Sequence, residues 1–537
     1  MQSFKQITLS LCISLTLGAG LLAGQAFAGP KPDQIDRLSK DLTPMGSERA
    51  GNADGTIPEW TGGITTPPPE YSPGDHHQDP FKDDSPLFRI TGANYQDYGD
   101  KLTVGQKATF AKYPDTYFMD VYPSRRSTSF PEHIYEMTAK NGSTATLAEN
   151  GEGVENAAEG FPFPFPENAY ELMWNHKLKY KGIGGVRYNT QIAPTASGKF
   201  SVTVIREELL GLYYKRGVTI EEIDNILLYF FQEVESPARL AGNILLVHET
   251  LNQQVLPRQA WIYNPGQRRV RRAPNVAYDN PGTASDGLRT NDMTDMFNGA
   301  MDRFDWKVVG KQEIYIPYNS YKAHAEGITY DEFVMPGHLN PDLMRYELHR
   351  VWVIDATLKD GMRHINARRT FYLDEDSYQI VLIDHYDGRG QLWRASEAHS
   401  INYYEVPTTW STLEAHYDLQ SGRFVAQGFD NTTAVNTFNV ELQPTQFTPL
   451  AWRTRGRRLA VNQLIRPAFA GLVKGASHTC MTRSNTLPIT FYAVLAAGLI
   501  SLAAFADQHF DVEYAEQLPL AKDSLLLVFS ITFVCVV

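Results

Sequence analysis

Two pairs of acidic and histidine side chains could transfer protons. Glu347 and His349 are two positions apart, and so are Glu397 and His399. In an extended strand, residues at this spacing lie on the same face, where a carboxylate and an imidazole could act as base and acid on a substrate lying across the sheet. Structural pairing between neighbouring strands is the more common role of such residues. We therefore predict no catalytic residue, and keep a pair such as Glu397 and His399 as the alternative.

A dense basic cluster could bind an anion. Residues 267–272 read QRRVRR, and strand alternation would place Arg269 and Arg271 on one face, with Arg268 and Arg272 on the other. Two arginines on one face can bind a lipid head group, a phosphate or an acidic partner through paired hydrogen bonds. Arg269 and Arg271 are thus candidate ligand-binding residues. Salt bridges to acidic residues of neighbouring strands are the competing role, and the one that we favour.

Three short segments resemble metal sites only in part. Residues 51–60 have Asn and Asp at the spacing of a calcium loop, but Ala50 occupies the place of the first acidic ligand. Residues 248–252, HETLN, begin like a zinc-protease helix, but Asn replaces the second histidine. His76 and His77 lie between two Asp residues and could hold a metal, although we favour an exposed polar loop. We predict no metal and no cofactor.

Composition and missing motifs exclude several classes of protein. The chain of 537 residues has a formal net charge of -12, with 20% charged and 12% aromatic residues. This balance is typical of a globular protein and argues against broad binding to nucleic-acid phosphates. Residues 29–458 contain no Gly-x-Ser-x-Gly elbow, Walker loop, dinucleotide fingerprint or Cys-x-x-Cys pair. We expect no nucleic-acid partner.

The two Glu–His pairs lie in residues 345–404, which are predicted to form four consecutive antiparallel strands. In the first strand, Trp352 and Ile354 alternate with Val351 and Val353, so the two sets lie on opposite faces. Asp, Gly and Ser residues between the hydrophobic runs are typical of turns. These turns are expected at residues 359–361, 374–377 and 387–390.

Further strands and a few short helices are predicted around this meander. The strands are expected at residues 199–207, 225–236, 243–250, 257–264, 268–273, 306–316 and 412–428. The helices are expected at 33–42, at 104–112 after Thr103, at 133–140 after Pro131, and at 168–180 with Asn168 as N-cap. Residues 160–166, GFPFPFP, should form an extended ribbon whose Phe side chains pack on the sheet. The predicted fold class is α+β, with mostly antiparallel strands.

The meander resembles a known group of proteins. Its pattern of strands around YLDEDSYQIV and DGRGQLWR is similar to hairpins of the LolA/LolB family, periplasmic lipoprotein carriers built as an open half-barrel over a helical lid. Over residues 30–457, the sequence more closely resembles the Gram-negative family known as domain of unknown function 1329, often described as outer membrane lipoprotein-sorting proteins. The segments that carry this resemblance are DLTPMGSERAGNADGTIPEWTGG (41–63), KYPDTYFMDVYPS (112–124), PRQAWIYNPGQRRVRRAP (257–274) and PGHLNPDLMRYELHRVWVIDATLK (336–359).

The resemblance implies a fold and a place for a ligand. Residues 181–458 should form a LolA-like open half-barrel, and residues 29–180 should supply an irregular wrap whose short helices cover its concave side. An apolar face there could hold an acyl chain, or it could be an ordinary packed core. The residues expected on this face are Trp352, Ile354, Ile365, Phe371, Leu373, Ile380 and Leu382.

The function implied by the resemblance is transport within the cell envelope. We expect a periplasmic carrier or chaperone, and not an enzyme, that binds a hydrophobic ligand such as a lipid or a lipoprotein near the outer membrane. An outer-membrane protein and an inner-membrane transporter of the resistance-nodulation-division type are the expected partners. An enzyme acting on a lipid-like ester and an envelope scaffold without a ligand are the alternatives.

Both ends of the chain carry apolar segments. Residues 1–28 are predicted to be a secretory signal peptide that ends at a small-x-small cleavage site, Ala26-Phe27-Ala28. Residues 459–537 do not resemble the family. Within them, the uncharged segment 487–506 follows Met481 and reads as a second signal peptide, which suggests a joined downstream reading frame. A membrane anchor is the alternative, because twenty apolar residues can span a bilayer.

Overall fold

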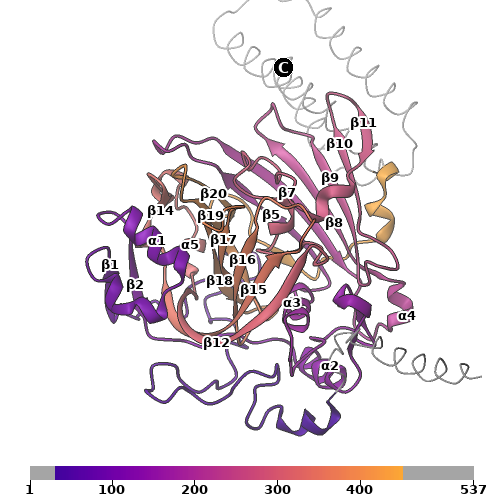
Figure 1. The fold of residues 1–537 in the computed structure, drawn as a ribbon. Coiled ribbons are helices and arrows are strands. Elements are labelled where there is room, and N and C mark those ends of the chain that lie inside the picture. Colours follow the sequence, from indigo (N-terminus) through magenta and orange to yellow (C-terminus); the bar gives the residue numbers. More distant parts are fainter. Residues whose placement is uncertain (1–30, 452–537) are drawn as a thin grey trace, which may run out of the picture. The chain divides into compact units, whose positions relative to one another are not determined.

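A computed structural model describes residues 31–451, which contain one large sheet of 17 strands and several short helices (Figure 1). Almost all strand pairs are antiparallel, and the sheet ends in edge strands instead of closing on itself. The predicted fold class is therefore confirmed. Among the described residues, no helix is both long and apolar enough to cross a membrane. The predicted signal peptide and the predicted apolar segment 487–506 lie outside this range.

The predicted meander is confirmed, and further antiparallel strands flank it. Its four strands are β15 (Tyr346–Leu358), β16 (Arg368–Asp374), β17 (Ile380–Tyr386) and β18 (Leu392–Tyr403). On one side β15 pairs along its whole length with β12 (Phe304–Pro317). On the other side β18 pairs with β19 (Thr408–Asp418), which pairs with β20 (Arg423–Phe429). The single strand predicted for 412–428 is wrong, because a turn at Gly422, with φ of 69°, separates β19 from β20.

The second half of the sheet comes from residues 184–272. Its main strands run in the order β11, β10, β9, β8, β7, and the free edge of β7 pairs first with β6 and then with β5. Since β6 also pairs with β20, the two halves form one continuous sheet. The strands are β5 (Gly184–Tyr188), β6 (Thr190–Ile192), β7 (Val202–Gly211), β8 (Ile226–Ser236), β9 (Ile244–Thr250), β10 (Gln259–Asn264) and β11 (Arg269–Arg272).

Small strand pairs complete the sheet or lie beside it. Strand β1 (Phe88–Thr91) pairs with β2 (Phe118–Tyr122), which adds to β15 in the parallel sense. Strand β21 (Thr437–Phe438) pairs with β5. Two separate hairpins are β3 (Thr146–Leu147) with β4 (Val154–Glu155), and β13 (Val334–Met335) with β14 (His338–Leu339).

Three helices in the N-terminal third begin where the sequence predicts. They are α1 (Val104–Lys112), α2 (Glu132–Gly142) and α3 (Ala169–Lys177). Thr103 and Asn168 cap α1 and α3 through side-chain oxygens that accept backbone N–H groups. The helix predicted for 33–42 is only a 3-10 turn over Pro32–Arg37. Single-turn helices follow later in the chain: α4 (Ile220–Ile223), α5 (Tyr321–His324) and α6 (Tyr330–Phe333).

The helices pack into different parts of the core. Buried residues of α3, together with Phe161 and Phe163, form one cluster with the meander, which confirms that the 160–166 ribbon packs on the sheet. Helix α1 belongs to a different cluster through Phe110, and Figure 1 shows it beside β1 and β2, apart from α2 and α3. The prediction that the N-terminal helices all cover one side of the sheet is therefore wrong for α1.

A candidate ligand-binding groove

Most of the apolar residues predicted to line a cavity lie in packed core. Ile354, Phe371, Leu373 and Ile380 have no exposed surface, and they belong to the cluster that contains the α3 residues Leu172, Met173 and Trp174. The indole of Trp174 also donates a hydrogen bond of 2.8 Å to the Gly151 carbonyl. Because helix α3 fills the space over this part of the meander, these residues are structural, whichever ligand the protein binds.

Three of the predicted cavity residues lie elsewhere. Leu382 faces the opposite side of the sheet, where it pairs with Tyr372 and packs with Val353. An irregularity in the β16–β17 register leaves Val381 without a facing residue in β16, so Ile380 and Leu382 lie on opposite faces and the simple alternation assumed from the sequence fails there. Ile365 precedes β16 and is 37% exposed, and Trp352 packs at the margin of the α3 cluster.

An open groove lies on the neighbouring half of the sheet. Its floor is formed by apolar side chains of β7, β8 and β9, which are half-buried except for Val247, at 6% exposed, and the residues of 291–298 together with Trp410 and Phe438 form its other walls. The enclosed part measures about 100 Å³. We call this feature the β7–β9 groove. Its apolar floor consists of Leu209, Leu228, Phe230, Leu245 and Val247.

Charged side chains are concentrated beside this apolar floor. Asp295 forms ion pairs with Lys179 at 2.7 Å and with Lys181, and its second oxygen accepts a hydrogen bond of 2.9 Å from the indole of Trp410. The two ammonium groups hold the pKa of the Asp295 carboxyl far below its usual range, despite burial. Further ion pairs join Arg187 to Glu207, at 2.5 Å, and Arg258 to Glu249.

Lys177, the last residue of α3, is different from the other cations. It lines the groove, is 6% exposed, and has no ion pair with any residue of 31–451. Its ammonium group lies 4.2 Å from the centre of the Trp174 ring and donates to the Gly299 carbonyl at 3.3 Å. Burial lowers the pKa of Lys177 to about 8, although Glu249 favours the charged form. The groove therefore offers one buried cation that has no carboxylate in ion-pair contact among residues 31–451.

Arg269 and Arg271, the predicted anion-binding pair, lie at the edge of the sheet, on the face that forms the groove floor. The strand register places Arg271 beside Ile262 of β10, and Ile262 beside Leu245 in the groove floor. Ile262 is 43% exposed and both arginines are exposed. No ion pair joins either arginine to another residue of 31–451, so the salt bridges that we favoured from the sequence are not found there. Arg272 pairs with Trp261 on the opposite face, as the alternation predicts.

The predicted acid/base pairs are buried away from the groove. Glu397 accepts a hydrogen bond of 3.0 Å from the Tyr346 hydroxyl, and His399 Nε2 lies 3.5 Å from the Glu397 carboxylate. His349 Nε2 lies 3.1 Å from Glu347 Oε2. None of these four residues lines the β7–β9 groove.

Two of the segments that resemble metal sites only in part can be placed in the structure. His77 is 3% exposed, with its ring nitrogens 3.0 Å from His324 and 2.7 Å from Glu405, so the exposed loop that we favoured is wrong for this residue. His248 lies on strand β9, not on a helix, and it bonds to the Phe447 carbonyl.

The fold and this groove define a class: an open, mostly antiparallel sheet with short N-terminal helices and an amphipathic groove on one face. A comparison with protein families identifies the family within that class. The family described as "Protein of unknown function (DUF1329)" matches residues 89–453, and this chain belongs to it, as its sequence motifs predict.

One relative and two solved structures are similar to this chain. An uncharacterized protein of Pseudomonas aeruginosa is 48% identical over 443 residues, which is 82% of this chain and 97% of that protein. A putative outer membrane lipoprotein-sorting protein domain from Vibrio parahaemolyticus aligns at 14% identity and a TM-score of 0.37, over 53% of this chain and 97% of its own. A DUF1329 family protein from Desulfovibrio piger aligns at 14% identity and a TM-score of 0.38, over the same 53% and 97%.

Sequence reasoning missed most of the groove. Strands β8 and β9 are predicted correctly, yet their uninterrupted apolar runs, ILLYFF and ILLV, give no sign that one face is left partly uncovered. Lys177, Lys179 and Lys181 do carry a signal, because three lysines alternate at the end of a buried helix and its connection to β5. Asp295, the partner of Lys179 and Lys181, lies more than a hundred positions away, in a connection whose path the sequence does not reveal.

Proposed function

We propose that this protein is a carrier that holds an acyl chain of a lipid or lipoprotein in the β7–β9 groove, with an anionic head group beside Lys177. The observation that carries the proposal is the juxtaposition of mostly half-buried apolar side chains with a buried ammonium group that forms no ion pair with a carboxylate of the described residues. A ligand that has an alkyl chain and one negative charge complements both features.

The size of the groove narrows the ligand class. Its enclosed volume of about 100 Å³ is well below the roughly 300 Å³ at which pockets for drug-sized ligands begin. One alkyl chain could enter, with the rest of the molecule outside along the exposed Ile262. Removing apolar surface from water contributes roughly 25 cal/mol per Å², so even part of a long chain contributes substantially to affinity.

The charge balance supports a single anionic head group. The groove lining contains four cations, Lys177, Lys181, Arg187 and Arg258, against the carboxylates of Glu207, Glu249 and Asp295. Among these four cations, Lys177 is the one without an ion pair within residues 31–451, since the other three have acidic partners, and Lys181 shares Asp295 with Lys179. A carboxylate or phosphate beside Lys177 would neutralise it, and hydrogen bonds between charged groups are stronger than neutral ones.

We also propose where such a carrier acts. The secretory leader predicted from the sequence supports a periplasmic location. The family resemblance supports a function near the outer membrane. An outer-membrane protein and an inner-membrane transporter of the resistance-nodulation-division type remain the proposed partners. We propose no enzymatic activity, because the Glu397–His399 pair is buried and does not line the groove.

Native mass spectrometry of the full chain, purified from a bacterial envelope, tests the proposal. We expect a stoichiometric co-purified lipid, and binding of a fluorescent long-chain fatty acid after that lipid is removed. Val247→Trp, which fills the groove floor, should weaken this binding by at least about tenfold, or about 1.4 kcal/mol. Leu245→Trp provides a second blocking variant at a half-buried position.

The matched control is Val255→Trp, at a position that is 75% exposed and outside the groove. It should bind the fatty acid like the wild type. Absence of both co-purified lipid and probe binding in the wild type would contradict the carrier function. Equal affinities for the wild type and both blocking variants would contradict this location for the ligand.

A further inference from the structure

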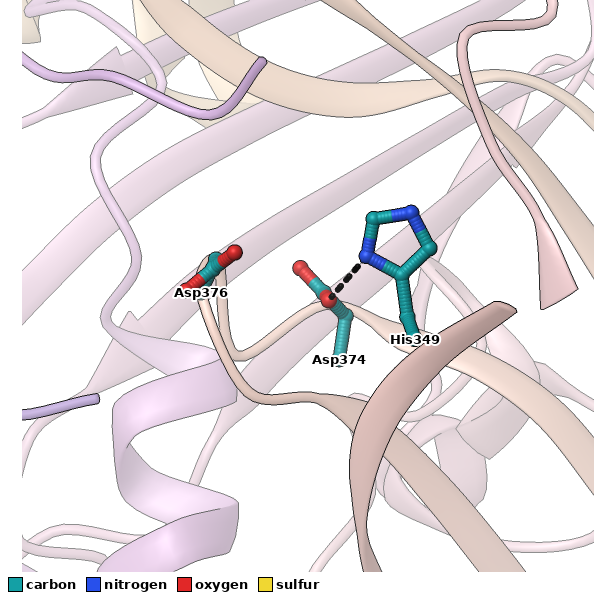
Figure 2. A group of neighbouring side chains, drawn as sticks. All are labelled: His349, Asp374 and Asp376. Carbon is teal, nitrogen blue, oxygen red and sulfur yellow. Dashed lines mark ion pairs between the residues drawn. The ribbon is translucent and has the colours of Figure 1, made fainter. Parts of the chain in front are cut away.

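Three buried side chains meet on the meander, far from the groove lining. They are His349 on β15, Asp374 at the end of β16, and Asp376 in the turn that leads to β17. One nitrogen or oxygen atom of each lies within 4.8 Å of the others, and none of the three residues is more than 4% exposed. Figure 2 shows the His349 ring and the Asp374 carboxylate facing each other, with Asp376 alongside.

The orientation of His349 is fixed from two sides. Its Nε2 lies 3.1 Å from Glu347 Oε2, and its ring lies against the ring of Tyr318, with centroids 4.0 Å apart. When Nε2 donates its proton to Glu347, Nδ1 carries a free lone pair directed toward Asp374. A carboxylate on the far nitrogen of a histidine is the usual arrangement that orients an imidazole ligand toward a metal ion.

Asp374 presents an oxygen that accepts no hydrogen bond from the described residues. Its Oδ2 accepts hydrogen bonds from the Ser377 backbone N–H and hydroxyl, at 3.0 and 2.5 Å. Its Oδ1 is buried and accepts no hydrogen bond within residues 31–451. Buried carboxylate oxygens normally have at least one partner, so this atom requires an explanation.

The gap between the two facing atoms fits a metal ion. His349 Nδ1 and Asp374 Oδ1 are 3.9 Å apart, which is too long for a hydrogen bond. Zinc binds imidazole nitrogen and carboxylate oxygen at about 2.0–2.2 Å, so an ion lying slightly off the line between these atoms would contact both. Asp376 can supply the third ligand of the metal ion. Both of its oxygens accept from Arg126, at 2.7 and 2.8 Å, but each keeps a second lone pair.

We propose that His349, Asp374 and Asp376 form a binding site for a divalent first-row metal ion of the Zn²⁺ type. One imidazole and two carboxylates are ligands that this class of ion accepts. Because the site is closed, the role of the ion is structural. It connects β15 to the β16–β17 turn and, through Arg126, to the backbone carbonyls of Glu48 and Arg49.

The test is the metal content of the full chain, expressed in zinc-supplemented medium with an affinity tag that contains no histidine. Elemental analysis should give about one Zn²⁺ per wild-type chain and a loss of at least tenfold in Asp374→Asn. Glu347→Gln, which changes the residue that orients His349 and that also accepts from the Arg125 backbone N–H, Asn319 and Arg345, should retain the site with about ten- to a hundredfold weaker affinity. Refolding with Co²⁺ should give visible ligand-field absorption in the wild type that is absent from Asp374→Asn.

Asp384→Asn is the matched control, because Asp384 is also a buried strand aspartate but bonds to Gly105 and Tyr372, away from His349. It should keep the wild-type zinc content. If Asp374→Asn does not fold, His349→Gln provides the same comparison. Wild-type protein without stoichiometric zinc or cobalt would overturn the proposal, and so would equal metal content in the wild type and the folded ligand variants. Neither result bears on fatty-acid binding in the groove.

Discussion

Lys177 shows how a single buried charge can determine ligand choice. The lysine lies at the end of α3, where a cation interacts favourably with the helix carbonyls. Its environment nevertheless disfavours the charge, since burial lowers its pKa to about 8. The charged groups that influence it are Glu249 and Glu152, which raise this pKa, and Arg258, which lowers it. A bound anion would stabilise the charged form.

Ligand affinity should therefore depend on pH near this value. Below pH 8 most Lys177 side chains carry a proton, and above it they lose it, whereas a free lysine stays charged to about pH 10. We expect fatty-acid affinity to fall by up to about tenfold between pH 7 and pH 9. Lys177→Met should bind with the lower affinity at every pH. Titrations with the fluorescent fatty acid at each pH measure the affinities of the wild type and of Lys177→Met.

The control for this prediction is Lys140→Met, which removes an exposed lysine from α2. It should keep the wild-type pH profile. A profile that stays the same in Lys177→Met would show that another group causes the pH dependence.

At the scale of helices and strands, the sequence predicts the features that depend on residues close together in the chain. Strand alternation and turn residues located the meander, and capping residues located the starts of α1 and α3, because these signals depend on near neighbours. Local patterns did not show the register irregularity before Leu382, nor that α3 would cover Ile354. The sequence therefore predicted the strands well, but it placed the ligand in a region that is packed core.

The cap of α3 can be tested directly. Asn168 accepts from the Glu171 backbone N–H at 3.1 Å and donates to the Glu171 carboxylate at 2.9 Å. Asn168→Ala removes both bonds and should lower the free energy of unfolding by about 1 kcal/mol. Asn168→Ser keeps an accepting oxygen and should lose much less. Urea denaturation followed by tryptophan fluorescence compares the variants, and equal losses in both would mean that the cap contributes little.

At the scale of the whole molecule, the open sheet leaves β11 as an edge strand. It carries two arginines on the groove face that form no ion pair with the part of the chain that the structure describes. These arginines could attract an anionic membrane surface or a head group, and a basic residue near such a surface contributes about 1 kcal/mol. Replacing both Arg269 and Arg271 by Gln should therefore weaken binding to anionic vesicles about thirtyfold at low salt, and less at high salt.

A double replacement of Arg268 and Arg272 by Gln removes the same charge from the turn and the opposite face. Vesicle sedimentation should show a smaller effect for this control than for the groove-face pair. Equal effects would mean that total charge matters and the groove face does not.

The contacts between the first and last parts of the described chain also affect how it folds. The Ser47 hydroxyl bonds to the Glu375 carbonyl across 328 positions, and Arg126 reaches Asp376 across 250. A ribosome delivers the N-terminal segment first, so Phe161, Phe163 and Trp174 are synthesised long before the meander that buries them. Folding with such high contact order is slow. The growing chain thus passes through a long stage with exposed aromatic residues, during which a holding chaperone would protect it from aggregation.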